Sequence, residues 1–422
     1  MMKGRISLYK GKRCQICTGC GRCQGVSGLQ VLTKRLQPFE VNLYNEEKER
    51  LVTVDLGTTT IAMQLHRRDG SVEDSFVALN PQHMYGADVV SRIAAAQLHS
   101  FERETAPAEH MRTLVLECIG KGIQRFRSKL EDGESLRMVL AANTTMVYLL
   151  MGWDTTEIGY APFEAKQLDA LETLVEDVPC FVIPGLSAFV GGDIVAGIHA
   201  SGMLESEALC LLIDLGTNGE MVLGNRAKII SCATAAGPAF EGGVNKGIWG
   251  SDMVKLLARM RKEELMDETG LLSDAFFETG VRIGNVCITQ ASVRAVQLAK
   301  AAIAAGIEIL IKQYGCNVSE IDRVILAGGF GYYINPRDAA DIGLLPETFV
   351  EKTYAGGNTA LSGALWVGEK LIQEKNGNKD IQNRIIDIKK IGNLSTTVIN
   401  LAKQDDFQEA YVRHMSFLGK KL

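Results

Sequence analysis

One short phrase occurs twice in this chain, each time between two apolar runs. It reads V-D-L-G-T-T-T at 54–60 and I-D-L-G-T-N-G at 213–219. In each copy an Asp ends a run typical of a buried strand, and a Gly beside hydroxyl or amide residues forms a tight hairpin. Backbone N–H groups and one carboxylate in such a hairpin suit a phosphate and the Mg²⁺ beside it. Two such hairpins indicate two lobes that hold one nucleotide between them.

The segments after the two phrases repeat the same order of elements. Both halves continue with two more strands, a long helix, a short apolar strand, and a strand that leads into a helix of small residues. In the first half we expect these elements at 61–66, 72–79, 108–130, 137–141, 180–185 and 189–202. In the second half we expect them at 220–223, 227–232, 290–314, 323–327, 349–355 and 359–369. A repeated βββαβα order predicts two α/β lobes of related fold.

Motifs in both halves resemble known proteins. The two hairpins and L-A-G-G-F-G at 326–331 resemble the phosphate and adenosine motifs of actin-like ATPases, the superfamily of sugar kinases, heat-shock chaperones and actin. Five further motifs resemble, more narrowly, the ATP-dependent reductive activators of corrinoid proteins: N-P-Q at 80–82, Y-G-A-D-V-V-S-R at 85–92, N-T-T-M at 143–146, A-G-P-A-F-E-G at 236–242 and G-L-L-P at 343–346. These unconnected motifs occur in the family's order, from about residue 51 onward.

The resemblance implies a fold and a division of the chain. We expect duplicated ribonuclease-H-like lobes of the actin-like ATPase class, lobe I at 51–203 and lobe II at 204–385. A strand and an amphipathic helix are expected at 386–422, packed back on a lobe. The resemblance does not cover the part of the chain before residue 51.

The hairpins also predict the chemistry of a nucleotide site. Asp55 and Asp214 are expected to hold Mg²⁺, through bound waters, because this ion gives up its hydration reluctantly. The superfamily resemblance places Asp193 beside the γ-phosphate, where its carboxylate orients the attacking water, or else serves only as a dipole partner at a helix N-terminus. The remaining residues expected to bind the nucleotide are Gly57, Thr58, Thr59, Gly216, Thr217, Asn218 and Gly219 at the phosphates, and Gly328 and Gly329 at the adenosine.

Two helices rich in small residues are expected to cross closely. The small residues are Gly191, Gly192, Ala196 and Gly197 on the first helix, and Ser362, Gly363 and Ala364 on the second. Small side chains let two helix backbones approach, so this crossing is predicted to be the hinge about which the lobes rotate.

Four cysteines precede the lobes in the spacing C-x2-C-x2-C-x2-C, at Cys14, Cys17, Cys20 and Cys23. Closely spaced thiols on a Gly-containing loop can bind one iron–sulfur cube, so we expect a 4Fe-4S cluster in a segment at 1–40, followed by a polar linker at 41–50. Zinc usually requires two C-x2-C pairs held apart by a loop, and zinc, disulfides and free thiols are the alternatives. The known corrinoid activators carry a 2Fe-2S domain with wider cysteine spacing at this end, or ferredoxin modules elsewhere. Cluster type, and a fourth ligand from elsewhere, therefore stay open.

Charge and hydropathy restrict the partners and the location. Residues 1–35 hold eight Lys and Arg and no acidic residue, which favours an anionic cluster and an acidic electron carrier such as ferredoxin or flavodoxin. A nucleic-acid arm is the alternative, but this segment is short and carries cysteines where such an arm would carry aromatic residues. No apolar run reaches the roughly 18 residues of a membrane span. We expect a cytoplasmic protein of anaerobic metabolism that binds neither membrane nor nucleic acid.

Three functions compete on this basis. The favoured one, implied by the resemblance, is an ATP hydrolase coupled to electron transfer, which passes a low-potential electron to Co(II) of an inactivated corrinoid protein or corrinoid-dependent methyltransferase. The second is an activator of another iron–sulfur enzyme, such as a dehydratase. The third is a small-molecule kinase, which would leave the cysteines without a role. The oligomeric state is open, with a homodimer as one arrangement.

Overall fold

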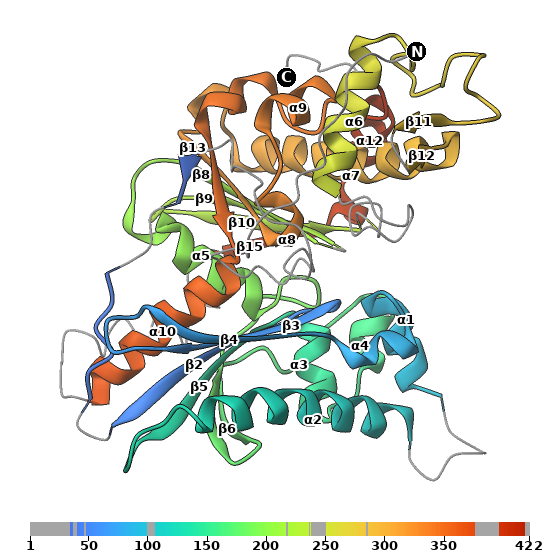
Figure 1. Cartoon of the computed structure of the whole chain (residues 1–422). Helices are drawn as coiled ribbons and strands as arrows, with labels where there is room; N and C mark the ends of the chain where they lie inside the picture. Colours follow the sequence, from blue (N-terminus) through green and yellow to red (C-terminus); the bar gives the residue numbers. More distant parts are fainter. Residues whose placement is uncertain are drawn as a thin grey trace. The chain divides into compact units, whose positions relative to one another are not determined.

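The computed structural model describes residues 34–36, 40–45, 48–98, 106–216, 218–235, 237, 250–283, 286–375 and 396–417. These residues form two compact α/β units (Figure 1). The first unit comprises the described residues of 37–204 and 358–398, and the second unit those of 34–36, 205–357 and 399–417. The four clustered cysteines and Thr217 lie outside the described residues.

The first unit is built on a six-stranded sheet with the strand order β4-β3-β2-β5-β7-β6. Its strands are β2 (Glu49–Leu56), β3 (Thr60–His66), β4 (Val72–Leu79), β5 (Ser135–Ala142), β6 (Leu171–Val175) and β7 (Val178–Val182). Its helices are α1 (Val89–Ala96), α2 (Pro107–Arg127), α3 (Thr144–Met151), α4 (Thr156–Gly159), α5 (Gly192–Ser201) and α10 (Thr359–Lys375), with 3₁₀ turns η2 (Pro81–Tyr85) and η3 (Met203–Glu205). Because α2 and α10 lie on opposite faces of the sheet, the central strands are apolar on both sides (Figure 1).

The second unit is built on a seven-stranded sheet with the strand order β1-β14-β13-β8-β9-β10-β15. Its strands are β1 (Lys34–Arg35), β8 (Cys210–Leu215), β9 (Gly219–Gly224), β10 (Ile229–Thr234), β13 (Arg323–Ala327), β14 (Thr353–Gly357) and β15 (Thr396–Ile399). A separate antiparallel pair is formed by β11 (Val281–Ile283) and β12 (Val286–Ile288). Its helices are α6 (Gly250–Lys262), α7 (Gln290–Tyr314), α8 (Gly328–Gly331), α9 (Pro336–Asp341) and α12 (Phe407–Arg413), with 3₁₀ turns η5 (Val318–Glu320), η6 (Glu347–Lys352) and η8 (Leu401–Lys403).

The two sheets share one topology. Five strands follow the order β4-β3-β2-β5-β7 in the first sheet and β10-β9-β8-β13-β14 in the second. In both sheets the strand before the hairpin pairs antiparallel with the strand after it and parallel with the next strand of the sheet. The duplicated α/β fold predicted from the repeated element order is therefore confirmed.

The long helix of the second half shows how local signals set its bounds. We expect it at 290–314, and α7 spans Gln290–Tyr314. The Thr289 side chain accepts from the backbone N–H of Ser292 at the first turn, and Gly315 ends the helix with φ 85°. A capping residue at one end and a left-handed glycine at the other are both visible in the sequence.

Two expectations about the second half differ from the structure. The strand expected at 349–355 is a 3₁₀ turn up to Lys352 and a strand only from Thr353. An apolar run does not distinguish these states, because the fully buried Phe349 lies in the turn. Helix α10, which the sequence places in the interval 204–385, groups with the first unit.

The grouping of α10 follows from its contact with α5. A side chain at Gly363 would place its Cβ 1.9 Å from the carbonyl oxygen of Ala196, so only glycine permits this approach. Two of the small residues noted in the sequence therefore do meet, on α5 and α10 of the first unit.

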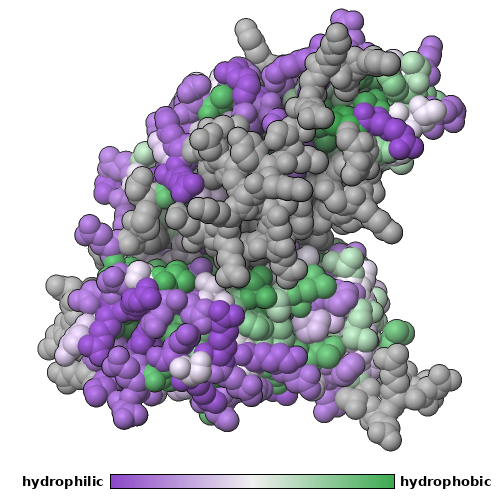
Figure 2. All heavy atoms as spheres, viewed as in Figure 1, coloured by the Kyte–Doolittle hydropathy of each residue, from purple (hydrophilic) through white to green (hydrophobic). Residues whose placement is uncertain are grey.

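The surface of the described residues carries both hydrophilic and hydrophobic side chains (Figure 2). On the coloured part of the visible face, the space-filling view shows mainly hydrophilic side chains with smaller hydrophobic groups among them (Figure 2). The exposed apolar residues include Met84, Val90 and Leu98. None of the helices in the described part of the chain is long and apolar enough to cross a bilayer.

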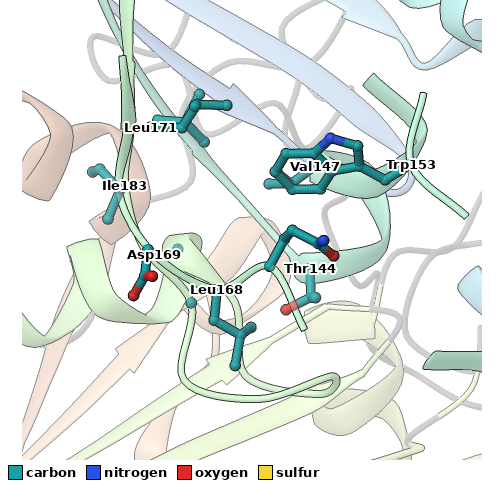
Figure 3. A pocket seen from close by; sticks show the side chains of 11 residues that line it. Thr144, Val147, Trp153, Leu168, Asp169, Leu171 and Ile183 are labelled. Carbon is teal, nitrogen blue, oxygen red and sulfur yellow. The ribbon is translucent and has the colours of Figure 1, made fainter. Parts of the chain in front are cut away.

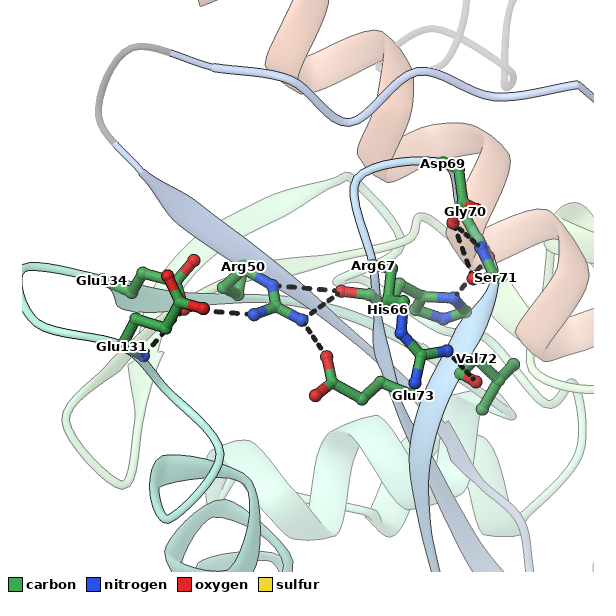
Figure 4. A network of polar contacts seen from close by, with 10 residues as sticks. All are labelled: Arg50, His66, Arg67, Asp69, Gly70, Ser71, Val72, Glu73, Glu131 and Glu134. Carbon is green, nitrogen blue, oxygen red and sulfur yellow. Dashed lines mark hydrogen bonds and ion pairs between the residues drawn. The ribbon is translucent and has the colours of Figure 1, made fainter.

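A partly buried polar network supports the ends of β2 and β3 that lie far from the hairpin (Figure 4). Arg50 donates to Glu134 at 3.1 Å and to the carbonyl of His66 at 3.1 Å, and it also pairs with Glu73. The His66 ring joins Thr53 Oγ1 (2.9 Å) to the carbonyl of Gly70 (3.0 Å). Because a carbonyl only accepts, His66 Nδ1 carries the hydrogen and Nε2 accepts from Thr53.

This neutral histidine predicts a pH dependence of stability. Burial lowers the pKa of His66 to about 4, although the hydrogen bond to the carbonyl of Gly70 raises it. The unfolded chain therefore takes up a proton between about pH 6.5 and 4 that the folded state excludes, and the free energy of unfolding should fall by on the order of 3 kcal/mol over this range. Urea unfolding of wild type and His66→Gln at several pH values measures the difference. An equal fall in both proteins would contradict the assignment.

Candidate functional site

The first hairpin, between β2 and β3, is held by backbone hydrogen bonds. The N–H of Gly57 donates to the carbonyl of Thr60 at 2.9 Å, and a Cβ at Gly57 would lie 2.9 Å from that same oxygen. Asn80 donates from its backbone N–H to Thr59 O at 2.9 Å and from its side chain to Gly57 O at 2.8 Å. The asparagine of the N-P-Q motif thus fixes the hairpin in one conformation.

The Thr58 hydroxyl is oriented by a second asparagine. Asn143 accepts from the backbone N–H of Met146 at 3.0 Å, which fixes its amide at the start of α3. Its Nδ2 then donates to Thr58 Oγ1 at 3.0 Å. Because the hydroxyl oxygen accepts this bond, its own hydrogen can be donated to another acceptor, and a phosphate oxygen is one that this hairpin suits.

Two carboxyl groups lie in the same region of the first unit. Asp55 Oδ2 accepts from Asn358 Nδ2 at 2.6 Å. Burial raises the pKa of Asp55 to about 7; the bond from Asn358 lowers it and the charge of Asp193 raises it. Burial likewise raises the pKa of Asp193 to about 6, although the hydrogen bond from the backbone N–H of Ile194 lowers it. The structure therefore brings the predicted residues Asp55 and Asp193 within electrostatic reach of each other.

The second hairpin, between β8 and β9, has a related construction. Gly216 N–H donates to the carbonyl of Asn218 at 2.9 Å. Gly328, with φ 81°, begins α8 directly beside this hairpin. A Cβ at this position would lie 2.6 Å from Asp214 Oδ1 and 2.5 Å from Leu215 O. Asp214, predicted to hold Mg²⁺, and Gly328, predicted to lie at the adenosine, are thus neighbours in the second unit. Gly219 is buried against Ile303, and Gly329 lies within α8.

Three asparagines with evident roles were not predicted as site residues. Asn80 and Asn143 lie in two of the motifs that indicated the family, but these asparagines have no role predicted from the sequence. Asn358 lies in none of the motifs. A signal for Asn358 exists in the duplication: V-G-G-D at 190–193 and A-G-G-N at 355–358 are the matching joins from strand to helix in the two halves. Each join places one polar side chain directly after a Gly-Gly pair.

A small pocket lies beside the join that carries Asp193 (Figure 3). Thr144, Trp153 and Gly192 are among its lining residues, and Thr144 Oγ1 donates to the carbonyl of Ser187 at 2.6 Å. Its volume of about 10 Å³ is that of roughly one water molecule. This pocket is therefore too small for a nucleotide.

The cysteines of the chain fall into two groups, the four expected cluster ligands and six others. Cys14, Cys17, Cys20 and Cys23 lie outside the described residues. Of the cysteines that are described, Cys118, Cys180, Cys210 and Cys232 are buried free thiols, and Cys287 and Cys316 are partly buried ones. Within the described ranges, His, Cys, Asp and Glu side chains form no group of three that could hold a metal ion.

Family models match nearly all of the chain outside the cysteine segment. Residues 51–206 match the model described as the RACo middle region. Residues 208–247 and 243–422 match the model described as the C-terminal domain of RACo, the ASKHA domain. The family resemblance read from the motifs is thereby confirmed.

Individual relatives agree with the family models. The chain is 28% identical over 465 residues to the corrinoid activation enzyme RamQ of Eubacterium limosum, covering 93% of this chain and 75% of RamQ. It is 21% identical over 433 residues to the [Co(II) methylated amine-specific corrinoid protein] reductase of Methanosarcina barkeri, covering 87% of this chain and 76% of the reductase. The solved structure of a reductive activator for a corrinoid, iron–sulfur protein has a TM-score of 0.73 and 28% identity, covering 89% of this chain and 67% of that one.

Proposed function

Because the chain belongs to the RACo family, we propose that it is an ATP-dependent reductive activator of a corrinoid protein or corrinoid-dependent methyltransferase. In this reaction one low-potential electron reduces Co(II) of the inactivated partner to Co(I). Passing one electron uphill by a few tenths of a volt costs on the order of 5 to 10 kcal/mol, which ATP turnover can supply. The observation that carries the proposal is the pair of similar hairpins, each beside an aspartate, in a chain that also carries a cysteine segment.

The hairpins supply the groups that a Mg²⁺–nucleotide complex needs. Asp55 and Asp214 each offer a carboxylate beside a hairpin with backbone N–H groups, and carboxylate oxygens and waters are the ligands that Mg²⁺ prefers. The ion would neutralise phosphate charge when bound. Thr58 donates to a phosphate oxygen, Gly328 lets the chain pass close to the nucleotide, and Asp193 orients the water for hydrolysis.

The cysteine segment supplies the electron in this proposal. Cys14, Cys17, Cys20 and Cys23 would hold an iron–sulfur cluster of the 4Fe-4S type, which would supply one-electron transfer from an acidic carrier such as ferredoxin or flavodoxin. The described end of the basic segment supports a link to the ATPase part. Strand β1 pairs in parallel with β14, Lys34 beside Tyr354 and Arg35 beside Ala355. A cytoplasmic location and a homodimer stay predictions.

The test follows the visible spectrum of a Co(II) corrinoid partner under anaerobic conditions. Reduction to Co(I) should require ATP, Mg²⁺, a low-potential reductant and the cysteines together. Cys17→Ser or Cys20→Ser should remove iron and end the reduction while sparing ATP hydrolysis, since the cysteines lie outside the hairpins.

The outcomes separate the three candidate functions. Equal reduction with and without ATP, or zinc in place of iron, would overturn the proposal. ATP-dependent reduction of an iron–sulfur dehydratase instead of the corrinoid partner would favour the second function. ATP-dependent phosphorylation of a sugar or acid would favour the kinase.

A further inference from the structure

We propose that Asn358 is a positioning residue for ATP turnover, which holds one oxygen of Asp55 and leaves the other for the hydrated Mg²⁺ of the nucleotide. The inference rests on the proposed function, because it assigns Asp55 to the phosphate site. It adds a residue to that site from a different part of the chain, 303 residues away from Asp55.

Both ends of the Asn358 side chain are bound. Nδ2 donates to Asp55 Oδ2 at 2.6 Å, and Oδ1 accepts from the backbone N–H of Leu361 at 2.8 Å. Because a backbone N–H can only donate, the amide oxygen must face Leu361 and the amide nitrogen must face Asp55. Asn358 is 8% exposed, so the bond to Leu361 is buried and the bond to Asp55 is partly buried.

The backbone of Asn358 is held as firmly as its side chain. Its carbonyl accepts from the backbone N–H and from the hydroxyl of Ser362, each at 3.1 Å. Gly357, with φ 70°, ends β14 and turns the chain into α10. The Asp55 carboxylate is thereby hydrogen-bonded to a residue at the first turn of a packed helix. Such a partner holds the carboxylate in place more rigidly than a surface side chain would.

The residue type at this position fits the proposed role. The matching join in the other half ends in Asp193, whereas this join ends in an amide. A carboxylate at 358 would place a second negative charge within hydrogen-bond distance of the Asp55 carboxylate, and the two groups would repel each other. The Asn358 amide N–H instead donates to that carboxylate and adds no charge. The alternative role is purely structural, as the N-terminal cap of α10.

The test separates the two bonds of Asn358. In Asn358→Ser the hydroxyl still caps the helix, because serine is a good N-cap, but it lacks the amide that donates to Asp55. Asn335→Ser is the matched control, since Asn335 caps α9 through Arg337 N–H in the second unit. Mn²⁺ binding to the full-length protein with ADP, followed by electron paramagnetic resonance, measures the ion site without relying on activity.

We expect Asn358→Ser to weaken Mn²⁺ binding by about tenfold and to lower kcat by about tenfold. Its affinity for ADP without metal and its thermal midpoint should equal those of the control variant. In an Asp55→Asn background, Asn358→Ser should cause no further loss of Mn²⁺ affinity, because its effect passes through the Asp55 carboxylate. Unchanged Mn²⁺ binding in the single variant, or an additive loss in the double variant, would overturn the role of Asn358. Failure of the proposed function would look different, because the wild type would then show no ATP-dependent reduction.

Discussion

Asp55→Asn and Asp214→Asn are each expected to lower ATP turnover by about tenfold or more, with the iron content of the protein unchanged. Each substitution removes the negative charge beside a phosphate hairpin but keeps the size of the side chain, so the hairpins themselves should persist. Asp55 lies at the end of β2 in the first unit, and Asp214 at the end of β8 in the second. A loss in both variants would show that both hairpins serve one nucleotide reaction.

The measurement is steady-state phosphate release at saturating ATP, together with iron analysis of the same samples. Asp132→Asn is the control, because Asp132 is an exposed aspartate in a loop of the first unit. Its turnover should equal that of the wild type. Wild-type turnover in either hairpin variant would remove that aspartate from the site.

Gly363→Ala is expected to destabilise the first unit by about 3 kcal/mol or more. The added Cβ would lie 1.9 Å from the carbonyl oxygen of Ala196, and this backbone atom cannot move aside without separating α10 from α5. Since α5 carries Asp193 and α10 begins just after Asn358, the variant should also lose ATP turnover. Urea unfolding monitored by circular dichroism gives the change in stability.

A glycine at the end of the same helix pair provides the comparison. Gly202 ends α5 with φ 67°, and no atom lies within 4 Å of a Cβ built there. Gly202→Ala should therefore cost only the strain of a left-handed backbone, about 1 kcal/mol. Equal destabilisation by the two substitutions would contradict the close approach of α5 and α10.

Much of the site could be predicted because its parts are local in sequence. A hairpin that binds phosphate needs an aspartate, a glycine and small polar residues within a few positions, and both copies of the phrase contain them. Helix α7 is similar, because Thr289 and Gly315 mark its ends by their own conformational preferences. The repeat of these local signals in one order was enough to predict the duplicated fold.

The partners of these local elements depended on the tertiary structure. The bond between Asn358 and Asp55, and the approach of Gly328 to Asp214, join residues that are far apart in the chain. No spacing rule predicts such pairs, since they depend on how strands align in a sheet. The two joins V-G-G-D and A-G-G-N were visible as a repeat, but only the fold showed which aspartate the second one holds.

The sequence alone therefore determined the two hairpins that follow Asp55 and Asp214, the repeated βββαβα order and the capped bounds of α7, because hydrophobic period, turn residues and capping residues act over a few positions. Only the tertiary structure decided that α10 groups with the first unit and that Asn358 holds Asp55. The physical reason is packing: Gly363 lets α10 reach Ala196 on α5, and that contact joins parts of the chain that local preferences cannot connect.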